Sequence, residues 1–441
     1  MISADLLRAR AVQAVIWGMP AVNFELLRQA AADAGATDNQ IIYWSRLPGW
    51  KNQTLTPNPD TLYFFPFFNT RDTGPVVLDI PPAGDGALTG SVDDGWQCSL
   101  EDVGPAGADG GRGGKYLILP PGYDRPVPDG YIVLAADTFT GFGAIRSNID
   151  SSSDADVDKA AAYGRRIGCY PLSQAAGPPA TVFVDALDTL FDNKIPYDIR
   201  FFELLHRFVQ REPWLQRDRA MIDVLKTIGI VKGMPFQPDR PATALLAEAI
   251  GEARDWLEAQ YPHAFEPPYF PGTHWAVPAG REVIAGMQSG FADADSYPVD
   301  ARGVLYSFIY FSAKRLGAGQ FYVMAIDDAM GVPLDGGRTY VLTVPADPPV
   351  TRYWSATVYD RSTHAHLPDA ERVSIASTAT DVQRNPDGAT EIYFGPERPP
   401  GAPNWIPTRG GRGFEVLFRL YGPQQALFDR TWSLPDIAPA V

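Results

Sequence analysis

The spacing of hydrophobic residues divides the chain into a strand-rich part, a helical part and a second strand-rich part. The chain begins with apolar residues at helical spacing, and Ser3 stands where a helix N-cap is expected. Short apolar segments bounded by Gly, Pro or Asp then follow one another, a pattern typical of antiparallel strands. The predicted strands in this part cover residues 61–69, 75–80, 97–103, 115–119, 131–136 and 138–144.

From about Ser152 the hydrophobic pattern changes to the helical period. The segment that starts there has capping and acidic side chains at its beginning and two arginines and a glycine near its end, which is the polarity of a helix. Further helices are predicted at 199–210, 215–228, 241–259 and 299–327. From Thr339 alternating strand patterns return almost to the end of the chain, and Asn385–Gly388 (NPDG) between two of them predicts a tight turn.

This order of elements predicts an α+β protein that is mainly β, with two antiparallel β-sandwiches. We expect an N-terminal helical segment at 1–36, a first β-sandwich at 37–150, a helical connecting region at 151–330 and a second β-sandwich at 331–441. A chain of 441 residues is long enough for two domains or more, and its 45% hydrophobic and 12% aromatic residues can fill large cores.

Charge and cysteine content exclude some classes of partner and scaffold. The formal net charge of −15 would repel both a nucleic-acid backbone and an anionic membrane, so we expect neither as a partner. Two cysteines, Cys98 and Cys169, are too few for a disulfide-stapled secreted scaffold. The N-terminus lacks the features of a signal peptide, and no segment reaches membrane-spanning length. The sequence therefore predicts a cytoplasmic protein, or a periplasmic one if a leader was removed.

One stretch, Thr54–Thr70 (TLTPNPDTLYFFPFFNT), joins a polar turn directly to an aromatic run. Pro fixes φ, and Asn and Asp bond to their own backbone, so the turn should be well defined. The aromatic run should form a core strand, in which Pro66 removes a ladder donor and indicates a bulge or an edge position. A rigid polar turn beside an aromatic core is typical of small-molecule pockets, and equally of the start of an ordinary strand, so both interpretations stay open.

The order of motifs resembles two bacterial families that occur together. TLTPNPDTLYF, GPVVLDIPP and KYLILPPG resemble domain of unknown function 1254, and the run from LDGGRTYVLTV to FRLYGP resembles its usual companion, domain of unknown function 1214. The resemblance covers most of the chain and implies two jelly-roll-like β-sandwiches and a homo-oligomer, but no settled reaction. Where the first family commonly shows a second Asn after Thr-Pro-Asn, this chain has Pro59.

Three residues of the N-terminal motif match the family pattern, namely Asn58, Asp60 and Tyr63. Asp60 is suited to act as a base, a ligand anchor or a turn cap. Tyr63 is suited to donate a hydrogen bond from an aromatic wall. A pocket role and a capping role for this motif both stay open.

The segment RYWSATVYDRSTHAHL holds the densest group of polar side chains. Strand alternation places Trp354, Ala356 and Val358 on one face and Tyr353, Ser355, Thr357 and Tyr359 on the other. The second face is either a wet exterior or the lining of a polar cleft. His364 and His366 stand two positions apart and could share a metal ion, but no third ligand has signature spacing. A divalent metal is therefore not favoured, and the sequence identifies no cofactor.

The strand FEVLFRLYGP shows a second alternation. Its predicted core face consists of Phe414, Val416, Phe418 and Leu420, and its opposite face consists of Glu415, Leu417, Arg419 and Tyr421. A buried Arg–Glu pair is costly unless it is well hydrogen-bonded, so the opposite face is expected to be solvated, at an interface, or part of a carboxylate-binding pocket. In a pocket, Arg419 would be the anion anchor.

The motifs of common nucleophile enzymes and zinc proteases are absent from the sequence. The leading hypothesis is an enzyme, a hydrolase or lyase, that acts on a small organic or sugar-like substrate by acid–base chemistry. Its expected catalytic residues are Asp60, Tyr63, Tyr359, Asp360 and His364, and its expected substrate-binding residues are Asn58, Trp354, Arg419 and Tyr421. The alternative is a non-catalytic ligand-binding or assembly protein, because β-sandwiches serve such proteins as readily.

Overall fold

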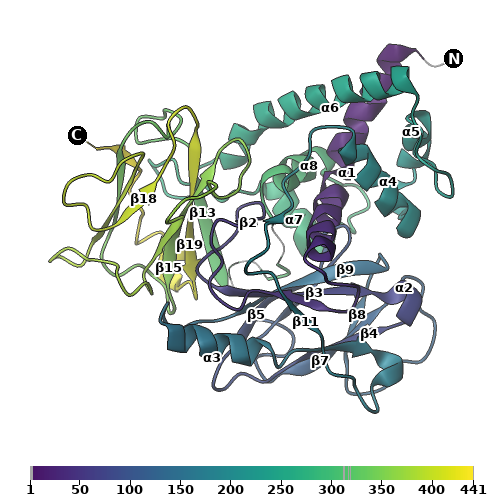
Figure 1. The fold of residues 1–441 in the computed structure, drawn as a ribbon, viewed down its shortest axis with the longest axis horizontal. Coiled ribbons are helices and arrows are strands. Elements are labelled where there is room, and N and C mark those ends of the chain that lie inside the picture. The colour runs from purple at the N-terminus through teal and green to yellow at the C-terminus, as the bar shows by residue number, and fades with distance from the viewer. Residues whose placement is uncertain (1–2, 311–312, 316, 318, 441) are drawn as a thin grey trace.

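A computed structural model describes residues 3–310, 313–315, 317 and 319–440. A long N-terminal helix, α1 (Ala4–Asp33), runs from one end of the molecule to its middle, with helices around it, two pairs of sheets beside it and α6 (Arg240–Gln260) along the top (Figure 1). Ser3 caps α1 as expected, because its side chain accepts a hydrogen bond from the Leu6 amide at 3.3 Å. The result is a mixed α+β protein with sandwich-like sheets, and the expectation of a mainly β protein is wrong, because the described chain is 27% helix and 24% strand.

The N-terminal sheets form a sandwich. A six-stranded sheet has the order β11-β1-β3-β9-β5-β6, and a four-stranded sheet has the order β10-β4-β7-β8, while β2 and β12 form a small pair. The strands are β1 (Ile41–Tyr43), β2 (Asn52–Gln53), β3 (Leu62–Asn69), β4 (Val76–Ile80), β5 (Leu88–Asp94), β6 (Ser99–Val103), β7 (Gly114–Leu119), β8 (Ile132–Ala135), β9 (Thr140–Ser147), β10 (Gly168–Pro171), β11 (Phe183–Asp185) and β12 (Phe191–Asp192). All six strands predicted here are confirmed to within three residues at each end.

Strand β3 buries both of its faces, which explains its richness in aromatic residues. Leu62, Phe64 and Phe68 point into the sandwich core, whereas Phe65 and Phe67 point the other way, into the core shared with the helices. A short helix, α2 (Thr70–Thr73), follows directly.

Pro66 does not mark a bulge or an edge, contrary to the expectation from the sequence. Strand β3 lies inside the sheet between β1 and β9 and keeps one register with β9 from Leu62↔Ser147 to Asn69↔Thr140. Gly143 on β9 leaves room for the proline ring, since a Cβ at Gly143 would lie 2.9 Å from the Pro66 Cγ atom. Because Gly143 has no side chain, the sheet accommodates the proline without a bulge.

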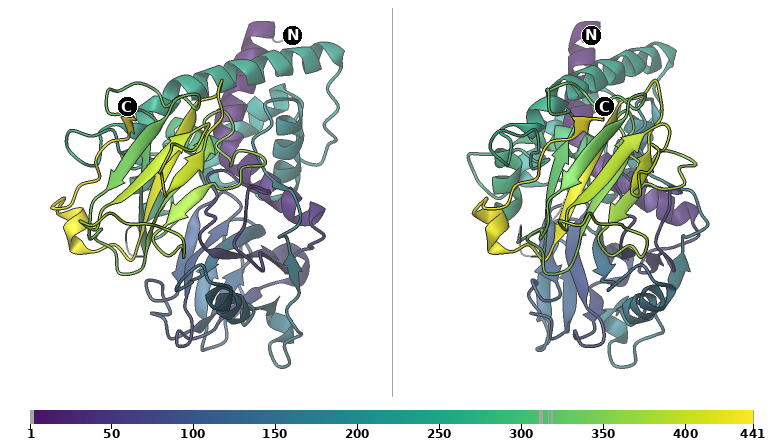
Figure 2. Two further views of the ribbon diagram at one scale, coloured as in Figure 1. Left: turned by 60° about the vertical axis from the view of Figure 1, so that its left-hand side comes forward. Right: turned by 90° about the vertical axis from the view of Figure 1, so that its left-hand side faces the viewer.

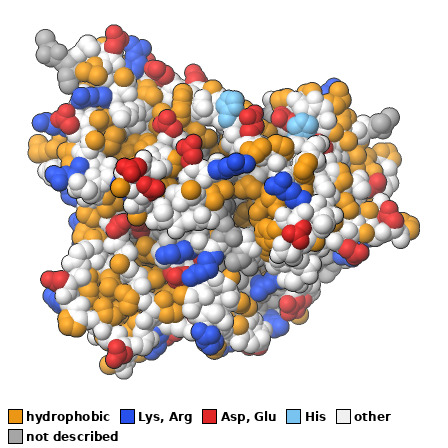
Figure 3. All heavy atoms as spheres, turned by 180° about the vertical axis from the view of Figure 1, so that it is seen from behind, with side chains coloured by type: hydrophobic (Ala, Val, Ile, Leu, Met, Phe, Trp, Pro, Cys, Tyr) orange, Lys and Arg blue, Asp and Glu red, His pale blue; other side chains and the backbone are white. Residues whose placement is uncertain are grey.

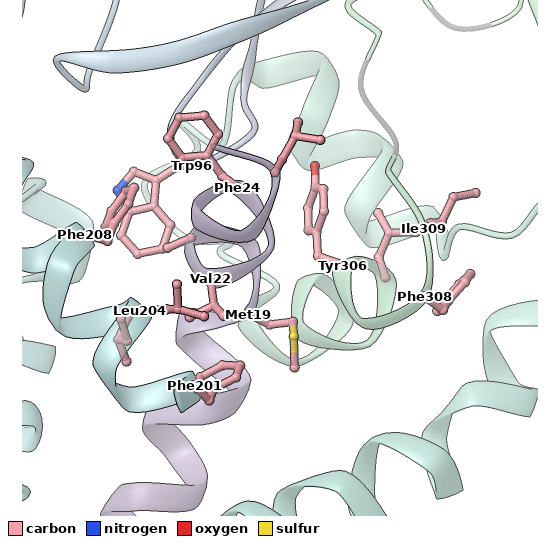
Figure 4. Close-up of a cluster of buried hydrophobic side chains, with 14 of the residues drawn as sticks. Met19, Val22, Phe24, Trp96, Phe201, Leu204, Phe208, Tyr306, Phe308 and Ile309 are labelled. Carbon is pink, nitrogen blue, oxygen red and sulfur yellow. The ribbon is translucent and has the colours of Figure 1, made fainter. Parts of the chain in front are cut away.

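Most of the helices that follow α1 pack around it and form the largest core. The helices that follow α1 include α3 (Asp154–Gly164), α4 (Arg200–Arg211), α5 (Met221–Thr227), α6, α7 (Arg281–Ser289) and α8 (Val299–Phe308), of which α4, α5, α6 and α8 contact α1. Figure 4 shows part of this core, where Met19 and Val22 of α1 lie between Leu204 of α4 and Tyr306 of α8. Helix α3 lies apart, against the N-terminal sandwich.

The helix predicted at 299–327 is wrong in its second half. Helix α8 ends at Phe308, and Gln320–Ala325 forms strand β13, which pairs with β19 over its whole length. Residues 311, 312, 316 and 318 of that prediction lie outside the described residues. A six-residue apolar segment fits a strand as well as a helix, and here the partner strand decides.

The C-terminal sheets form a second sandwich, with strand orders β13-β19-β15-β16 and β18-β17-β14-β20. The elements that follow β13 are β14 (Tyr340–Val344), β15 (Trp354–Asp360), β16 (Ser374–Ala376), β17 (Thr390–Gly395), β18 (Trp405–Pro407), β19 (Phe414–Tyr421), α9 (Gln425–Phe428) and β20 (Ala438–Pro439). The predicted core faces of β15 and β19 are confirmed, because their Trp, Ala, Val, Phe and Leu side chains fill the space between these sheets.

The outer faces of β15 and β19 are buried as well. Thr357, Glu415 and Arg419 are each at most 2% exposed, because the turn before β3 and the end of α6 cover them. Figures 1 and 2 show the C-terminal sheets beside the helices and over one end of the N-terminal sheets. Within the described part of the chain, no helix is both long enough and apolar enough to cross a membrane.

Candidate functional site

A cavity of about 320 Å³ lies where the N-terminal sheet, the helices and the C-terminal sheet meet. Strands β3 and β9 form one wall, β13 and β19 form another, and the turn before β3 lies between them. Much of the lining is apolar and includes Leu27, Leu55, Phe65, Phe142, Val277 and Ile284. Figure 3 shows one face of the molecule, on which a hollow near the middle opens onto hydrophobic side chains. A cavity of this kind is suited to a small organic molecule.

Arg146 and Tyr63 stand opposite each other on the first wall, because β9 and β3 pair them in register. The Arg146 Nε atom donates a hydrogen bond to the Tyr63 hydroxyl oxygen at 3.1 Å. Burial acts to lower the pKa of Arg146, but the nearby phenols of Tyr322, Tyr63 and Tyr421 outweigh it and raise the pKa well above its ordinary value. Arg146 is therefore positively charged beside the cavity.

Arg419 on β19 supplies a second positive charge on the opposite wall. Its guanidinium donates hydrogen bonds to the Thr357 hydroxyl at 2.8 Å, the Thr56 carbonyl at 2.9 Å, the Pro57 carbonyl at 3.2 Å and the Tyr359 hydroxyl at 2.6 Å. It is 2% exposed, and its Nε atom has no hydrogen-bond partner among the described residues. Burial alone would lower the pKa of Arg419, but the surrounding tyrosines raise it, so the side chain stays charged.

A chain of hydrogen bonds connects the N-terminal motif to the cavity. The Asn58 amide nitrogen donates to the Tyr421 hydroxyl at 2.7 Å, and the Tyr421 and Tyr322 hydroxyl oxygens lie 3.1 Å apart. Tyr322 lines the cavity and its ring lies 5.5 Å from the Arg419 guanidinium carbon. Asn58 and Tyr421 do not line the cavity themselves, but they support Tyr322, which does.

The turn before β3 is held in an unusual backbone conformation. Thr56 has a φ of 42°, a value that a β-branched residue rarely adopts, and it lines the cavity. Its amide donates to the His364 carbonyl at 2.6 Å, and its own carbonyl accepts from Arg419. The Asn58 side-chain oxygen accepts from the Asp60 amide at 3.0 Å, as the sequence predicted for a rigid turn. Backbone strain of this kind is typical of ligand-binding sites.

Asp60 lies behind this turn, against the C-terminal sheet, and not in the cavity wall. Its Oδ2 atom accepts a hydrogen bond from the Ser374 hydroxyl at 2.6 Å. Burial raises the pKa of Asp60 above its ordinary value, and the Ser374 hydrogen bond and the charge of Arg419 offset this only in part. The charge of Arg419 acts on the Asp60 carboxyl, but the two side chains form no ion pair within the described residues.

The two histidines pack against different partners. The His364 Nδ1 atom lies 2.9 Å from Glu415 Oε1, and the Tyr261 hydroxyl donates to Glu415 Oε2 at 2.5 Å. His366 stacks on Tyr359 with ring centroids 5.4 Å apart, and burial lowers its pKa to about 3, so that it is neutral. Neither ring lines the cavity. Within the described ranges no group of three or more His, Cys, Asp or Glu side chains could hold a metal ion.

Asp360 and Trp354 do not line the cavity and have other partners. Asp360 forms an ion pair with Arg412 and accepts a hydrogen bond from the Ser362 amide at 2.8 Å. Burial acts to raise the pKa of Asp360, but these two partners outweigh it and lower the pKa. Trp354 stacks on Phe418 inside the second sandwich, with ring centroids 5.5 Å apart. Of the nine expected site residues, the cavity wall contains Tyr63 and Arg419. Tyr359 and Tyr421 lie one hydrogen bond behind it, and Asn58 lies two hydrogen bonds behind it.

Sequence reasoning missed two residues of the site, Arg146 and Tyr322. Arg146 lies two positions beyond the end of the predicted strand 138–144, and Tyr322 falls in the segment predicted as a helix. The sequence did contain a signal for Arg146. If the predicted strand 138–144 is extended by two residues, Arg146 falls on the same face as Phe142 and Ala144. Tyr322 had no such signal, because its place depends on the pairing of β13 with β19.

Three arginines line the cavity among the described residues, but Arg315 is ion-paired with Glu101 and Asp102. The charges without a paired carboxylate are therefore those of Arg146 and Arg419, which stand beside two phenols. Among the described lining residues there is no Asp, Glu or His, and neither Arg146 nor Arg419 forms an ion pair with any described carboxylate. Tyr63 and Tyr322 stand beside the two guanidinium groups. Such an arrangement can hold a negatively charged, hydrogen-bond-accepting group while the apolar lining contacts the rest of a ligand.

Comparison with known proteins assigns the two halves of this site to two families. Residues 39–171 match the family described as "Protein of unknown function (DUF1254)", and residues 319–425 match the one described as "Protein of unknown function (DUF1214)". Arg146 lies in the first region, and Tyr322 and Arg419 lie in the second. No curated protein matches the chain.

Two solved structures resemble the chain over nearly its whole length. The VPA0106 protein from Vibrio parahaemolyticus has 18% sequence identity and a TM-score of 0.59, with 99% of this chain and 100% of that chain covered. An uncharacterized protein from Burkholderia cenocepacia has 12% identity and a TM-score of 0.42, with 99% and 94% covered. At 18% sequence identity, the likeness to the Vibrio parahaemolyticus protein concerns the fold alone. The chain therefore contains a region that matches DUF1254 and, after it, a region that matches DUF1214, in the order expected from the sequence.

Proposed function

We propose that the protein binds a small organic anion in the cavity between the two sandwiches, with its charged group between Arg146 and Arg419. The observation that carries the proposal is the absence of an ion-paired carboxylate for either arginine among the described residues. A buried charge without a counter-ion is costly, and an anionic ligand would supply the missing one. Guanidinium groups are suited to carboxylates because they offer several donors in one plane.

The rest of the lining supports an apolar body on the ligand. Leu27, Phe65, Phe142 and Ile284 come from α1, β3, β9 and α7, so hydrophobic side chains surround the cavity on several sides. Medium-chain fatty acids and arylalkanoic acids combine one carboxylate with such a body. Octanoate and phenylacetate are therefore suitable probes.

The test is calorimetric titration of octanoate and phenylacetate into the wild type, Arg146→Gln and Arg166→Gln. Arg146→Gln should weaken binding by about tenfold or more, because a hydrogen-bonded charge is lost at the site. Arg166→Gln is the matched control, since Arg166 forms an exposed ion pair with Asp85 away from the cavity. The proposal fails if neither acid binds saturably to the wild type, or if the two variants bind them equally well.

The enzyme hypothesis from the sequence remains a second proposal: acid–base hydrolysis or elimination on a small organic or sugar-like substrate. The observation that favours it is the Tyr63 hydroxyl, which lines the cavity beside a charged arginine and could move a proton to or from a bound molecule. Asp60, Tyr359, Asp360 and His364 remain its other expected catalytic residues. Assays with 4-nitrophenyl esters of short dicarboxylic acids would test hydrolysis, and turnover unaffected by Tyr63→Phe would contradict the role of Tyr63.

Further expectations from the sequence go with these proposals. We propose jelly-roll connectivity in the sandwiches, a homo-oligomeric assembly and a cytoplasmic location. Light scattering coupled to gel filtration measures the assembly, and a monomeric mass would contradict it. A non-catalytic assembly role, the rival to ligand binding, is supported if the wild type forms a defined oligomer but binds neither probe.

A further inference from the structure

We infer that the charged group of the ligand is a carboxylate and that the site binds it in preference to a neutral carboxamide. Asn58 sets this preference through Tyr421 and Tyr322. The inference rests on the proposed function, because it concerns the same cavity. It begins with the orientation of the Asn58 amide. The Asn58 oxygen accepts the Asp60 backbone N–H at 3.0 Å, so the group that faces Tyr421 must be the nitrogen, which only donates.

The Asn58 amide fixes the direction of the next hydrogen bond. The Tyr421 oxygen accepts from Asn58, and Tyr421 is 2% exposed, so its own proton must go to a protein group. The partner available is the Tyr322 hydroxyl, 3.1 Å away. Tyr421 therefore donates to Tyr322, and the Tyr322 proton is left to point into the cavity.

The same reasoning applies to Tyr63. Its oxygen accepts from Arg146 Nε, and an arginine cannot accept in return, so the Tyr63 proton is also left for the cavity. Two phenol protons and two guanidinium groups then face the ligand from β3, β9, β13 and β19. A carboxylate presents only acceptors to these donors, whereas a carboxamide of the same shape would place one N–H₂ group against them.

The experiment compares acids with amides of equal shape on the full-length protein. We measure the dissociation constants of octanoate and octanamide, and of phenylacetate and phenylacetamide, and take the amide-to-acid ratio. The wild-type ratio should be about a hundred or more, because a site built to hydrogen-bond one group rejects an analogue that leaves its polar groups unpaired. Tyr421→Phe should lower the ratio about tenfold by releasing the Tyr322 proton from its fixed direction.

Two further variants isolate the role of Asn58. Asn58→Asp places an acceptor at Tyr421 and reverses the chain, so that Tyr322 turns a lone pair to the cavity and the amide-to-acid ratio falls further. Tyr353→Phe is the control, since Tyr353 is also buried, stacks on Tyr421 at 4.4 Å and approaches Asn58 at 3.5 Å, but is not in the chain to the cavity. It should leave the ratio within about twofold of the wild type.

The outcomes separate this inference from the proposed function. If Arg146→Gln weakens acid binding as expected but Tyr421→Phe and Asn58→Asp keep the wild-type ratio, the preference does not come from Asn58. The inference is then overturned, while the anion site stands. If the wild type binds neither acid, both are overturned. Should Asn58→Asp fail to fold, Tyr421→Phe and Tyr322→Phe decide the question, because each removes one hydroxyl of the chain.

Discussion

At the residue scale, the site depends on a few buried polar groups whose partners fix their charge and direction. Gln97 lines the cavity at the end of a turn, and its φ of 57° is held by hydrogen bonds around it. Asp94 forms that turn, because its Oδ1 atom accepts the Trp96 and Cys98 amides at 2.9 Å each. Burial raises the pKa of Asp94 to about 6 from an ordinary value of 3.8, against the Cys98 hydrogen bond, which lowers it.

A prediction follows for Asp94→Asn, which keeps the acceptor oxygen and removes the ionisable group. A carboxyl whose pKa is raised in the folded state stabilises the protein below its unfolded pKa, and this stability is lost as the pH rises through about 6. The free energy of unfolding of the wild type should therefore fall by about 2 kcal/mol more than that of the variant between pH 4 and pH 7. Urea unfolding at several pH values measures this, and parallel curves would contradict it.

At the element scale, strands that are buried on both faces connect the layers of the molecule. Strand β3 contacts the sandwich core with Phe64 and the helix core with Phe65, and β19 does the same with Phe418 and Leu417. The sequence predicted these strands because alternation within each strand is a local property. It left open what covers the polar face of β19, because that depends on elements far along the chain.

The contact between α3 and β3 gives a prediction at this scale. Gly164 ends α3, and a Cβ there would lie 2.1 Å from the Phe64 ring, which is fully buried. Gly164→Ala should therefore destabilise the protein by about 1–3 kcal/mol, as overpacking does in rigid cores.

A matched control is Gly251→Ala in the interior of α6, where an added Cβ would meet no atom within 4 Å. This variant should gain about 0.5–1 kcal/mol from helix propensity. Urea unfolding of both variants measures the difference. Equal stabilities for the two would show that α3 can move away from β3 at little cost.

At the scale of the whole molecule, the proposed ligand would bridge the two family regions. Arg146 belongs to the N-terminal sheet, and Arg419 belongs to the C-terminal sheet while it already donates to the Thr56 and Pro57 carbonyls of the N-terminal turn. A ligand held by both arginines adds a contact that neither sandwich can make alone. The two sandwiches should therefore unfold together when the ligand is bound.

Differential scanning calorimetry with octanoate tests this bridging. At a concentration of 100 times its dissociation constant, the ligand should add about 2.7 kcal/mol to the folded state and shift one common transition upward. Arg146→Gln should shift the transition clearly less at the same octanoate concentration, because a tenfold weaker affinity leaves about 1.4 kcal/mol of stabilisation or less. Two resolved transitions, of which octanoate moves a single one, would mean that one sandwich binds the ligand without the other.

The sequence by itself determined six strands of the N-terminal sheets and the long alternating strands after Thr339, the helical cap at Ser3, the rigid turn around Asn58 and the pair of families, but not β5 or β13. These follow from local alternation, capping and turn chemistry, which depend on neighbours within a few positions. Only the tertiary structure decided that Arg419 is buried, that Asp60 and His364 stand outside the cavity wall, and that Arg146 and Tyr322 belong to it. The physical reason is distance along the chain. Tyr63 and Arg146 are 83 positions apart, and Asn58 and Tyr421 are 363 positions apart, so their contacts exist only after the sheets have packed.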